Sequence, residues 1–99
     1  MPNHNYNRGR AFEYRVAKLY RDKGWFVFRS AGSHSPADLV CAKAGEIIAI
    51  QCQTDKYFTP VKIEQLAELI KENGWQAMLY WMDNRKLQSR EIGDSKNNE

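Results

Sequence analysis

Three polar residues stand at the open end of a predicted β-hairpin, where their spacing points to a shared site. Residues 37–53 read ADLVCAKAGEIIAIQCQ, two apolar runs joined by a turn at Ala44-Gly45. A tight turn at that point lays Asp38 opposite Gln51. Because successive side chains of a strand point to opposite faces, Asp38, Gln51 and Gln53 are expected on one face of the hairpin.

A fourth candidate, Glu13, belongs to a helix predicted over residues 9–23. Apolar residues recur there at helical spacing and form one stripe, which consists of Phe12, Val16, Leu19 and Tyr20. Glu13 lies one position beside this stripe. Its carboxylate can therefore reach the edge of the sheet and meet the hairpin residues. Oxygen ligands of this kind suit Mg²⁺, with Mn²⁺ as an alternative. A bound metal polarises a phosphate and lowers the pKa of a water, and a nearby cation offsets charge in the transition state.

The remaining elements form an alternating pattern. Strands are predicted over 25–30, 38–42, 46–53, 75–82 and 86–92, and a second helix runs from Pro60 to Asn73. The order α-β-β-β-α-β-β predicts an α/β domain with a mixed central sheet flanked by helices. We expect one domain over residues 1–92, with residues 1–8 as a flexible arm and 93–99 as a disordered tail.

Composition narrows the classes of function. The 99 residues have a net charge of +3, and residues 1–29 hold seven basic against two acidic residues, which suggests a phosphate-binding face. No apolar run is long enough to cross a membrane, and residues 1–10 do not resemble a secretory signal, so a cytoplasmic protein is expected. Cys41 and Cys52 lack metal-site spacing and read as buried apolar residues.

Taken together, these motifs resemble the archaeal-type Holliday junction resolvases of the PD-(D/E)XK nuclease superfamily. The likeness runs through RGRAFEYR, RDKGWFVFRSAGS, Asp38, the hairpin and TDKYFTPVKIEQLAELIKENG, from about residue 8 to 92. It implies a restriction-endonuclease-like core and a homodimeric, Mg²⁺-dependent endonuclease that nicks four-way DNA junctions symmetrically. Glu13 and Asp38 match the family's metal-binding carboxylates, and Ser33 matches a loop serine near the scissile phosphate. The resemblance and the charge pattern suggest DNA contacts by Arg8, Arg10, Arg15, Arg29, Lys56 and Lys62.

The chain departs from the family pattern at the end of its third strand. The family has Glu-X-Lys there, whereas this chain has Gln51-Cys52-Gln53. Gln51 keeps a carbonyl oxygen for the metal but no negative charge, and Gln53 lacks the positive charge. We therefore expect impaired hydrolysis, since single transition-state donors contribute about 10²–10³ in rate.

Three explanations of this departure remain open at this point. The chain is a deliberately inactivated variant, a natural junction-binding module without catalysis, or an enzyme that recruits another cation from Lys43, Lys56 or Lys62. A different class of function, a protein-interaction domain, would use a surface of aromatic residues: Tyr57, Phe58, Trp75 and Trp81.

Overall fold

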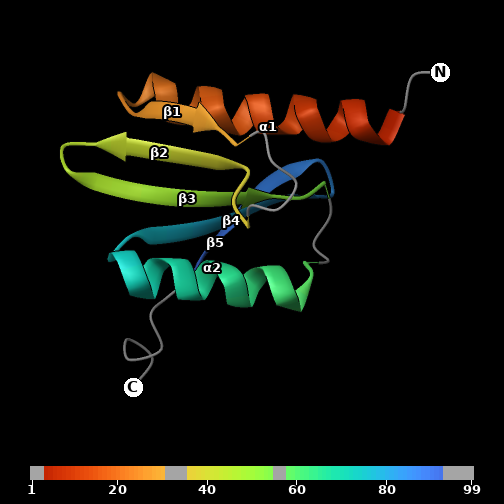
Figure 1. Ribbon diagram of the computed structural model, residues 1–99. Coiled ribbons are helices and arrows are strands. Elements are labelled where there is room, and N and C mark those ends of the chain that lie inside the picture. The colour runs from red at the N-terminus through yellow and green to blue at the C-terminus, as the bar shows by residue number, and fades with distance from the viewer. Residues whose placement is uncertain (1–3, 31–35, 55–57, 93–99) are drawn as a thin grey trace.

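The computed structural model describes residues 4–30, 36–54 and 58–92. Their elements follow the predicted order (Figure 1): α1 (His4–Asp22), β1 (Phe26–Arg29), β2 (Leu39–Lys43), β3 (Glu46–Cys52), α2 (Pro60–Asn73), β4 (Gln76–Asp83) and β5 (Lys86–Ile92). Strand boundaries differ from the predicted ones by one residue at most. Residues 93–99, predicted as a disordered tail, lie outside the described residues.

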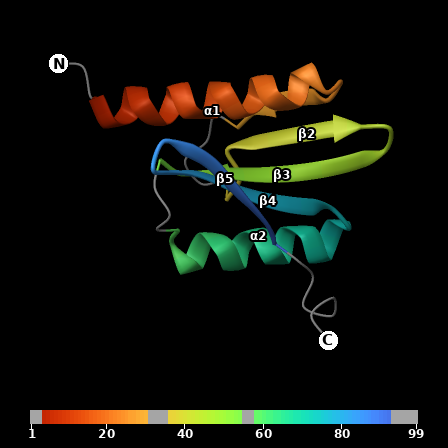
Figure 2. The ribbon, with the colours of Figure 1, turned by 180° about the vertical axis from the view of Figure 1, so that it is seen from behind.

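The five strands form one mixed sheet in the order β1-β2-β3-β4-β5. Only β3 and β4 pair in parallel, because the helix α2 connects them as a crossover, and the other pairs are antiparallel. The helices α1 and α2 lie on opposite faces of the sheet (Figures 1 and 2). The predicted mixed sheet flanked by helices is therefore confirmed.

One prediction was wrong at the N-terminal end. Residues 4–8 were expected in a flexible arm, but α1 begins at His4. These residues have no apolar stripe, so periodicity gave no signal for a helix. Once the amphipathic part has nucleated, each further residue adds a hydrogen bond at small cost, and a polar segment can extend the helix.

A tight turn sets the register of the hairpin formed by β2 and β3. Ala44 and Gly45 both have positive φ, at 51° and 86°, and the turn pairs Lys43 with Glu46. Two consecutive positive φ angles are typical of the turn whose twist matches that of the flanking strands. This register pairs Leu39 with Ile50, so the residues one step further along, Asp38 and Gln51, lie opposite each other as predicted.

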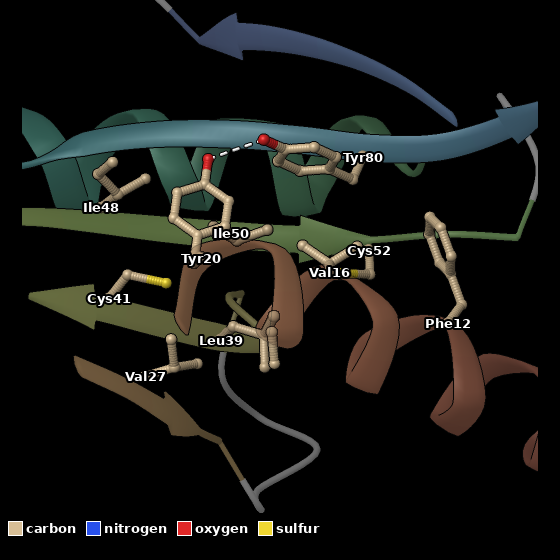
Figure 3. Packing of buried hydrophobic residues seen from close by; sticks show 11 residues of the cluster. Phe12, Val16, Tyr20, Val27, Leu39, Cys41, Ile48, Ile50, Cys52 and Tyr80 are labelled. Carbon is tan, nitrogen blue, oxygen red and sulfur yellow. Dashed lines mark hydrogen bonds between the residues drawn. The ribbon is translucent and has the colours of Figure 1, made fainter. Parts of the chain in front are cut away.

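Each helix covers its own apolar cluster. Under α1, buried side chains of the helix pack against odd-numbered residues of β2 and even-numbered residues of β3. The helix contributes Phe12, Val16 and Tyr20, and the strands contribute Leu39, Cys41, Ile48, Ile50 and Cys52 (Figure 3). The hydroxyl groups of Tyr20 and Tyr80 share a buried hydrogen bond of 2.8 Å in this cluster. Both cysteines are buried free thiols, as expected.

The second cluster lies between α2 and the opposite face, around Leu66, Ile70 and Leu79. Helix α2 begins at Pro60 and ends before Gly74, whose left-handed φ of 71° lets its N–H reach the Ile70 carbonyl oxygen. The side chain of Thr59, at the N-cap of α2, makes no capping hydrogen bond.

The aromatic residues proposed for a partner surface pack inward instead. Phe58, Trp75 and Trp81 are half-buried against the second cluster, and the rings of Phe58 and Trp81 meet edge to face at 5.8 Å. Tyr57 lies outside the described residues. This packing contradicts the idea of an exposed surface built on Phe58, Trp75 and Trp81.

Candidate functional site

A polar pocket opens at the end of the sheet where β2 begins and β3 ends. Its volume is about 230 Å³, and its lining unites residues from both helices and the hairpin: Gly9, Phe12, Glu13, Asp38, Gln51, Cys52, Gln53, Thr54 and Lys62. The predicted convergence of Glu13, Asp38, Gln51 and Gln53 is therefore observed. The part each residue plays in catalysis stays a prediction.

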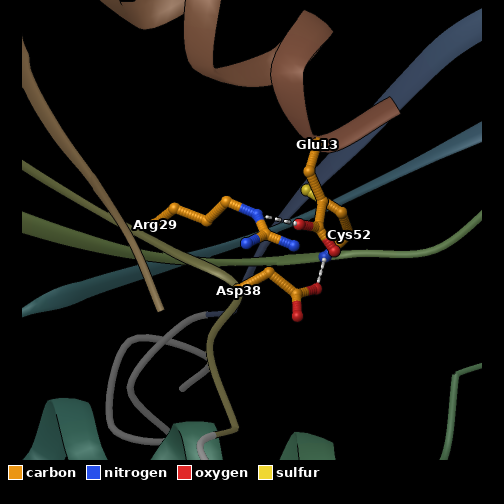
Figure 4. A network of polar contacts seen from close by, with 4 residues as sticks. All are labelled: Glu13, Arg29, Asp38 and Cys52. Atoms are coloured by element: carbon orange, nitrogen blue, oxygen red, sulfur yellow. Dashed lines mark hydrogen bonds and ion pairs between the residues drawn. The ribbon is translucent and has the colours of Figure 1, made fainter. Parts of the chain in front are cut away.

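Asp38 is fixed at the centre of the pocket by backbone hydrogen bonds. Its own N–H donates to the carbonyl oxygen of Ile50 at 2.7 Å, and its Oδ2 accepts the N–H of Cys52 at 2.9 Å (Figure 4). Burial raises the pKa of this carboxyl group above its ordinary value, against the opposing effects of the Cys52 N–H and the charges of Lys62 and Arg29. The carboxylate is thus held in one orientation. A bound cation would stabilise its ionised form, which burial disfavours.

Glu13 reaches the pocket from α1 and is oriented by an arginine. The Nε of Arg29 donates to Glu13 Oε1 at 3.0 Å, in a pair whose side chains are 31% and 18% exposed (Figure 4). Burial, followed by the negative charge of Asp38, raises the pKa of Glu13, whereas Arg29 and Arg10 lower it. The two carboxylates therefore interact, and Arg29 holds one of them in place.

Gln51 presents an unusual buried group. Its side chain is only 3% exposed, and among the described residues its Oε1 has no hydrogen-bond partner. Native proteins rarely leave a buried acceptor unpaired, and strain, a catalytic role, a bound water or a bound ion can each account for such an exception. Gln53 follows at the mouth of the pocket, half-buried, with its N–H donated to the Tyr80 carbonyl oxygen.

Lys62 approaches the same pocket from α2. Because β3 and β4 are parallel, the helix between them returns across the sheet, and its N-terminal end lies over the C-terminal end of β3 (Figure 1). Lys62 stands in the first turn of α2, and its positive charge lowers the pKa of Asp38. Lys43 lies at the far end of the hairpin, where its Nζ donates to the Lys23 carbonyl oxygen at 2.8 Å.

The residues predicted to contact DNA divide into three groups. Arg29 and Lys62 belong to the site itself, while Arg10 and Arg15 are exposed on α1. The Arg10 guanidinium lies 5.9 Å from the centre of the Tyr14 ring, and Arg15 contacts Met82. Lys56 and the side chain of Arg8 lie outside the described residues, as does Ser33, which was predicted near the scissile phosphate.

The oxygen ligands of this pocket fit a hard divalent cation, although they carry less negative charge than three carboxylates would. The pocket offers two carboxylates whose pKa values burial raises and one buried amide oxygen that has no partner in the described part of the chain. Mg²⁺ and Mn²⁺ accept such oxygen ligands. Within the described residues, no three His, Cys, Asp or Glu side chains gather as a metal site.

Sequence reasoning missed two features of the site. The first is the Arg29–Glu13 pair, which alternation could have revealed, because Val27 and Arg29 share the face of β1 that α1 covers. The second is a neighbouring pocket of about 540 Å³ that shares Phe12 and Thr54 with the first and includes Arg15 and Arg85. Nothing in the sequence pattern brings Arg85, in the turn after β4, to that surface.

In the described part of the chain, no helix is long and apolar enough to cross a membrane. The cytoplasmic location stays a prediction.

Comparisons with known proteins agree with the resemblance found in the sequence. A curated relative, the crossover junction endodeoxyribonuclease Hjc of Methanocaldococcus jannaschii, is 34% identical over 67 residues, which are 64% of this chain and 50% of the relative. The matched region thus spans half the length of that relative. The solved structure of Hjc from Archaeoglobus fulgidus, a Holliday junction resolvase, superposes with a TM-score of 0.71 at 21% identity, over 86% of this chain and 73% of that one. At this identity the likeness shows a shared fold.

The family model gives the broadest match. The model of the archaeal Holliday junction resolvases (Hjc) matches residues 4–90, which include the hairpin, both helices and every described residue of the pocket. This chain belongs to the archaeal Holliday junction resolvase family.

Proposed function

We propose that this protein is a structure-specific endonuclease that hydrolyses phosphodiester bonds in four-way DNA junctions. The observation that supports this most is the pocket in which Glu13, Asp38 and the buried side-chain oxygen of Gln51 meet, in a chain of this family. The M. jannaschii relative bears the name crossover junction endodeoxyribonuclease.

Glu13, Asp38 and Gln51 would hold Mg²⁺, or Mn²⁺, in this pocket. The bound ion would polarise the scissile phosphate and lower the pKa of a coordinated water. Asp38 is preorganised for this task by the N–H of Cys52, and Glu13 by Arg29. With an amide in place of a third carboxylate, the site attracts the cation less strongly, and we expect slower hydrolysis than in a site with all three charges.

The neighbouring pocket offers a path for the DNA backbone. It continues from the site through Phe12 and Thr54 to Arg15 and Arg85, two exposed cations that can bind phosphates. Arg10 adds a third cation on the same helix as Arg15. A backbone held along this path would present one phosphate to the carboxylates.

Symmetric cleavage implies two such sites. A four-way junction has two opposed strands of equal status, and a homodimer with a two-fold axis would present one pocket to each. Homodimerisation is therefore part of this proposal.

A second candidate function is junction binding without catalysis. The specific observation in its favour is that positions 51 and 53 both carry neutral amides, so that the pocket lacks two charges of the family pattern. This alternative keeps the DNA path and predicts tight binding that weakens steeply as salt rises.

A cleavage assay with a labelled four-way junction distinguishes the two functions. The unaltered chain and Asp38→Ala would be incubated with junction and with linear duplex, in Mg²⁺ and in Mn²⁺. We expect paired nicks in the junction, none in the duplex, and loss of nicking in Asp38→Ala. Junction binding without nicking by the unaltered chain would favour the binding module, and equal treatment of junction and duplex would contradict both.

A further inference from the structure

One cation reaches the pocket from an unexpected direction. The family pattern has its lysine on the strand, at the position of Gln53, whereas Lys62 lies in the first turn of α2. Among the residues that line the described pocket, Lys62 is the only lysine or arginine. It is half-buried, and it shares the pocket with Asp38, Gln51 and Gln53.

The other candidates for a replacement cation are less suitable. Lys43 is held at the far end of the hairpin by the Lys23 carbonyl oxygen, at 2.8 Å. Arg29 is engaged by Glu13, and its guanidinium orients that carboxylate. Lys56 lies outside the described residues.

The position of Lys62 is unfavourable for the helix itself. The N-terminal end of a helix carries a partial positive charge, which disfavours a cation in the first turn. The first turn of α2 contains no acidic residue to offset this effect. The negative charge of Asp38 across the pocket interacts favourably with this lysine and offsets the effect of the helix end.

We infer that Lys62 replaces the strand lysine of the family and acts as the catalytic cation of this pocket. This inference rests on the proposed function. In the hydrolysis, a P–O bond forms to a water oxygen while the ester P–O bond on the opposite side breaks. One proton of the water ends on the departing oxygen, and the other leaves the new phosphate group. The ammonium of Lys62 offsets the negative charge that builds on the phosphoryl oxygens and helps to orient the water.

A cation from Lys62 would let a chain without the Glu-X-Lys pair hydrolyse a phosphodiester bond. A helix and a strand that both reach the pocket can each supply a cation to one phosphate, because the lysine side chain is long and flexible. The required charge has then moved from Gln53 to Lys62, while Gln51 keeps an oxygen for the metal.

The test exchanges the cation between the two positions. Four proteins are compared: the unaltered chain, Lys62→Gln, Lys62→Gln/Gln53→Lys, and the control Lys71→Gln, which removes a lysine from the last turn of the same helix. Single-turnover cleavage of a four-way junction is measured at saturating protein, beside junction binding in EDTA and thermal melting. Saturating protein separates a catalytic cation from one that only binds phosphate.

We expect Lys62→Gln to lose about 10²-fold or more in cleavage rate while it still melts cooperatively and binds the junction. The double variant should recover most of this loss, and Lys71→Gln should cleave like the unaltered chain. Unchanged cleavage by Lys62→Gln, no recovery in the double variant, or junction binding without cleavage by the unaltered chain would overturn the role of Lys62. Failure of the unaltered chain to bind junctions would instead contradict the proposed function.

Discussion

Replacement of Gln51 by methionine should stabilise the fold and weaken the metal site at the same time. The Gln51 side chain is 3% exposed, and its Oε1 lacks a partner among the described residues. A buried acceptor without a hydrogen bond costs about 1–3 kcal/mol. Methionine has a similar shape and no such acceptor, so Gln51→Met should raise the free energy of unfolding by about 1–3 kcal/mol. In a domain of this size, each kcal/mol raises Tm by about 4–8 °C.

Urea unfolding and thermal melts in EDTA measure this gain. Gln53→Met is the matched control, because Gln53 is half-buried and has an interaction partner, so no comparable gain is expected. Added Mg²⁺ should stabilise the unaltered chain, since a ligand of the native state raises stability, and should stabilise Gln51→Met less. If Gln51→Met were less stable than the unaltered chain in EDTA, the reasoning about its unpaired oxygen would be refuted.

Three further predictions concern the carboxylates and the tyrosine pair. Burial raises the pKa of Asp38 from its ordinary value of 3.8. The contribution of this carboxyl group to the free energy of unfolding is therefore greatest below pH 3.8 and is lost as the pH rises through the raised pKa. Asp38→Asn should therefore melt at a higher temperature than the unaltered chain at pH 7 in EDTA, and a difference that did not shrink toward pH 3 would contradict this. Arg29→Met should raise the pKa of Glu13 further in an NMR titration, because the arginine lowers it, and an unchanged pKa would show that the ion pair has no influence. Tyr80→Phe should cost about 1–3 kcal/mol in urea unfolding, because it leaves the buried Tyr20 hydroxyl without its partner. Adding Tyr20→Phe should recover part of this loss, and strictly additive losses would argue against the shared hydrogen bond.

The hairpin part of the site could be predicted from the sequence because its geometry is local. The turn at Ala44-Gly45 fixes the register, and the register and the alternation of side chains bring Asp38, Gln51 and Gln53 to one end of the hairpin. Glu13 followed from its place beside the apolar stripe of α1. These inferences needed only the periods of helices and strands and the length of one turn.

The rest of the site depends on contacts between distant segments. Lys62 was one of three candidate cations, and only the crossover between β3 and β4 brings its end of α2 over the pocket while Lys43 remains at the far end. The hold of Arg29 on Glu13 requires the packing of α1 on β1. Sequence periodicity describes each helix or strand by itself and does not give the distance between two of them.

The central claim is that the pocket is a resolvase site in which amides replace two charges. Its most direct test is to restore those charges. The unaltered chain and Gln51→Glu/Gln53→Lys would be compared on the same labelled four-way junction in Mg²⁺. Because Lys62 is inferred to supply a cation already, the gain should come mainly from the restored carboxylate at position 51. Changes around metal ligands alter activity by about 10- to 100-fold, so the variant should cleave faster by about that factor, at the same phosphates and symmetrically in opposed strands. A variant that binds the junction but cleaves no faster, or that cuts linear duplex equally well, would contradict the account.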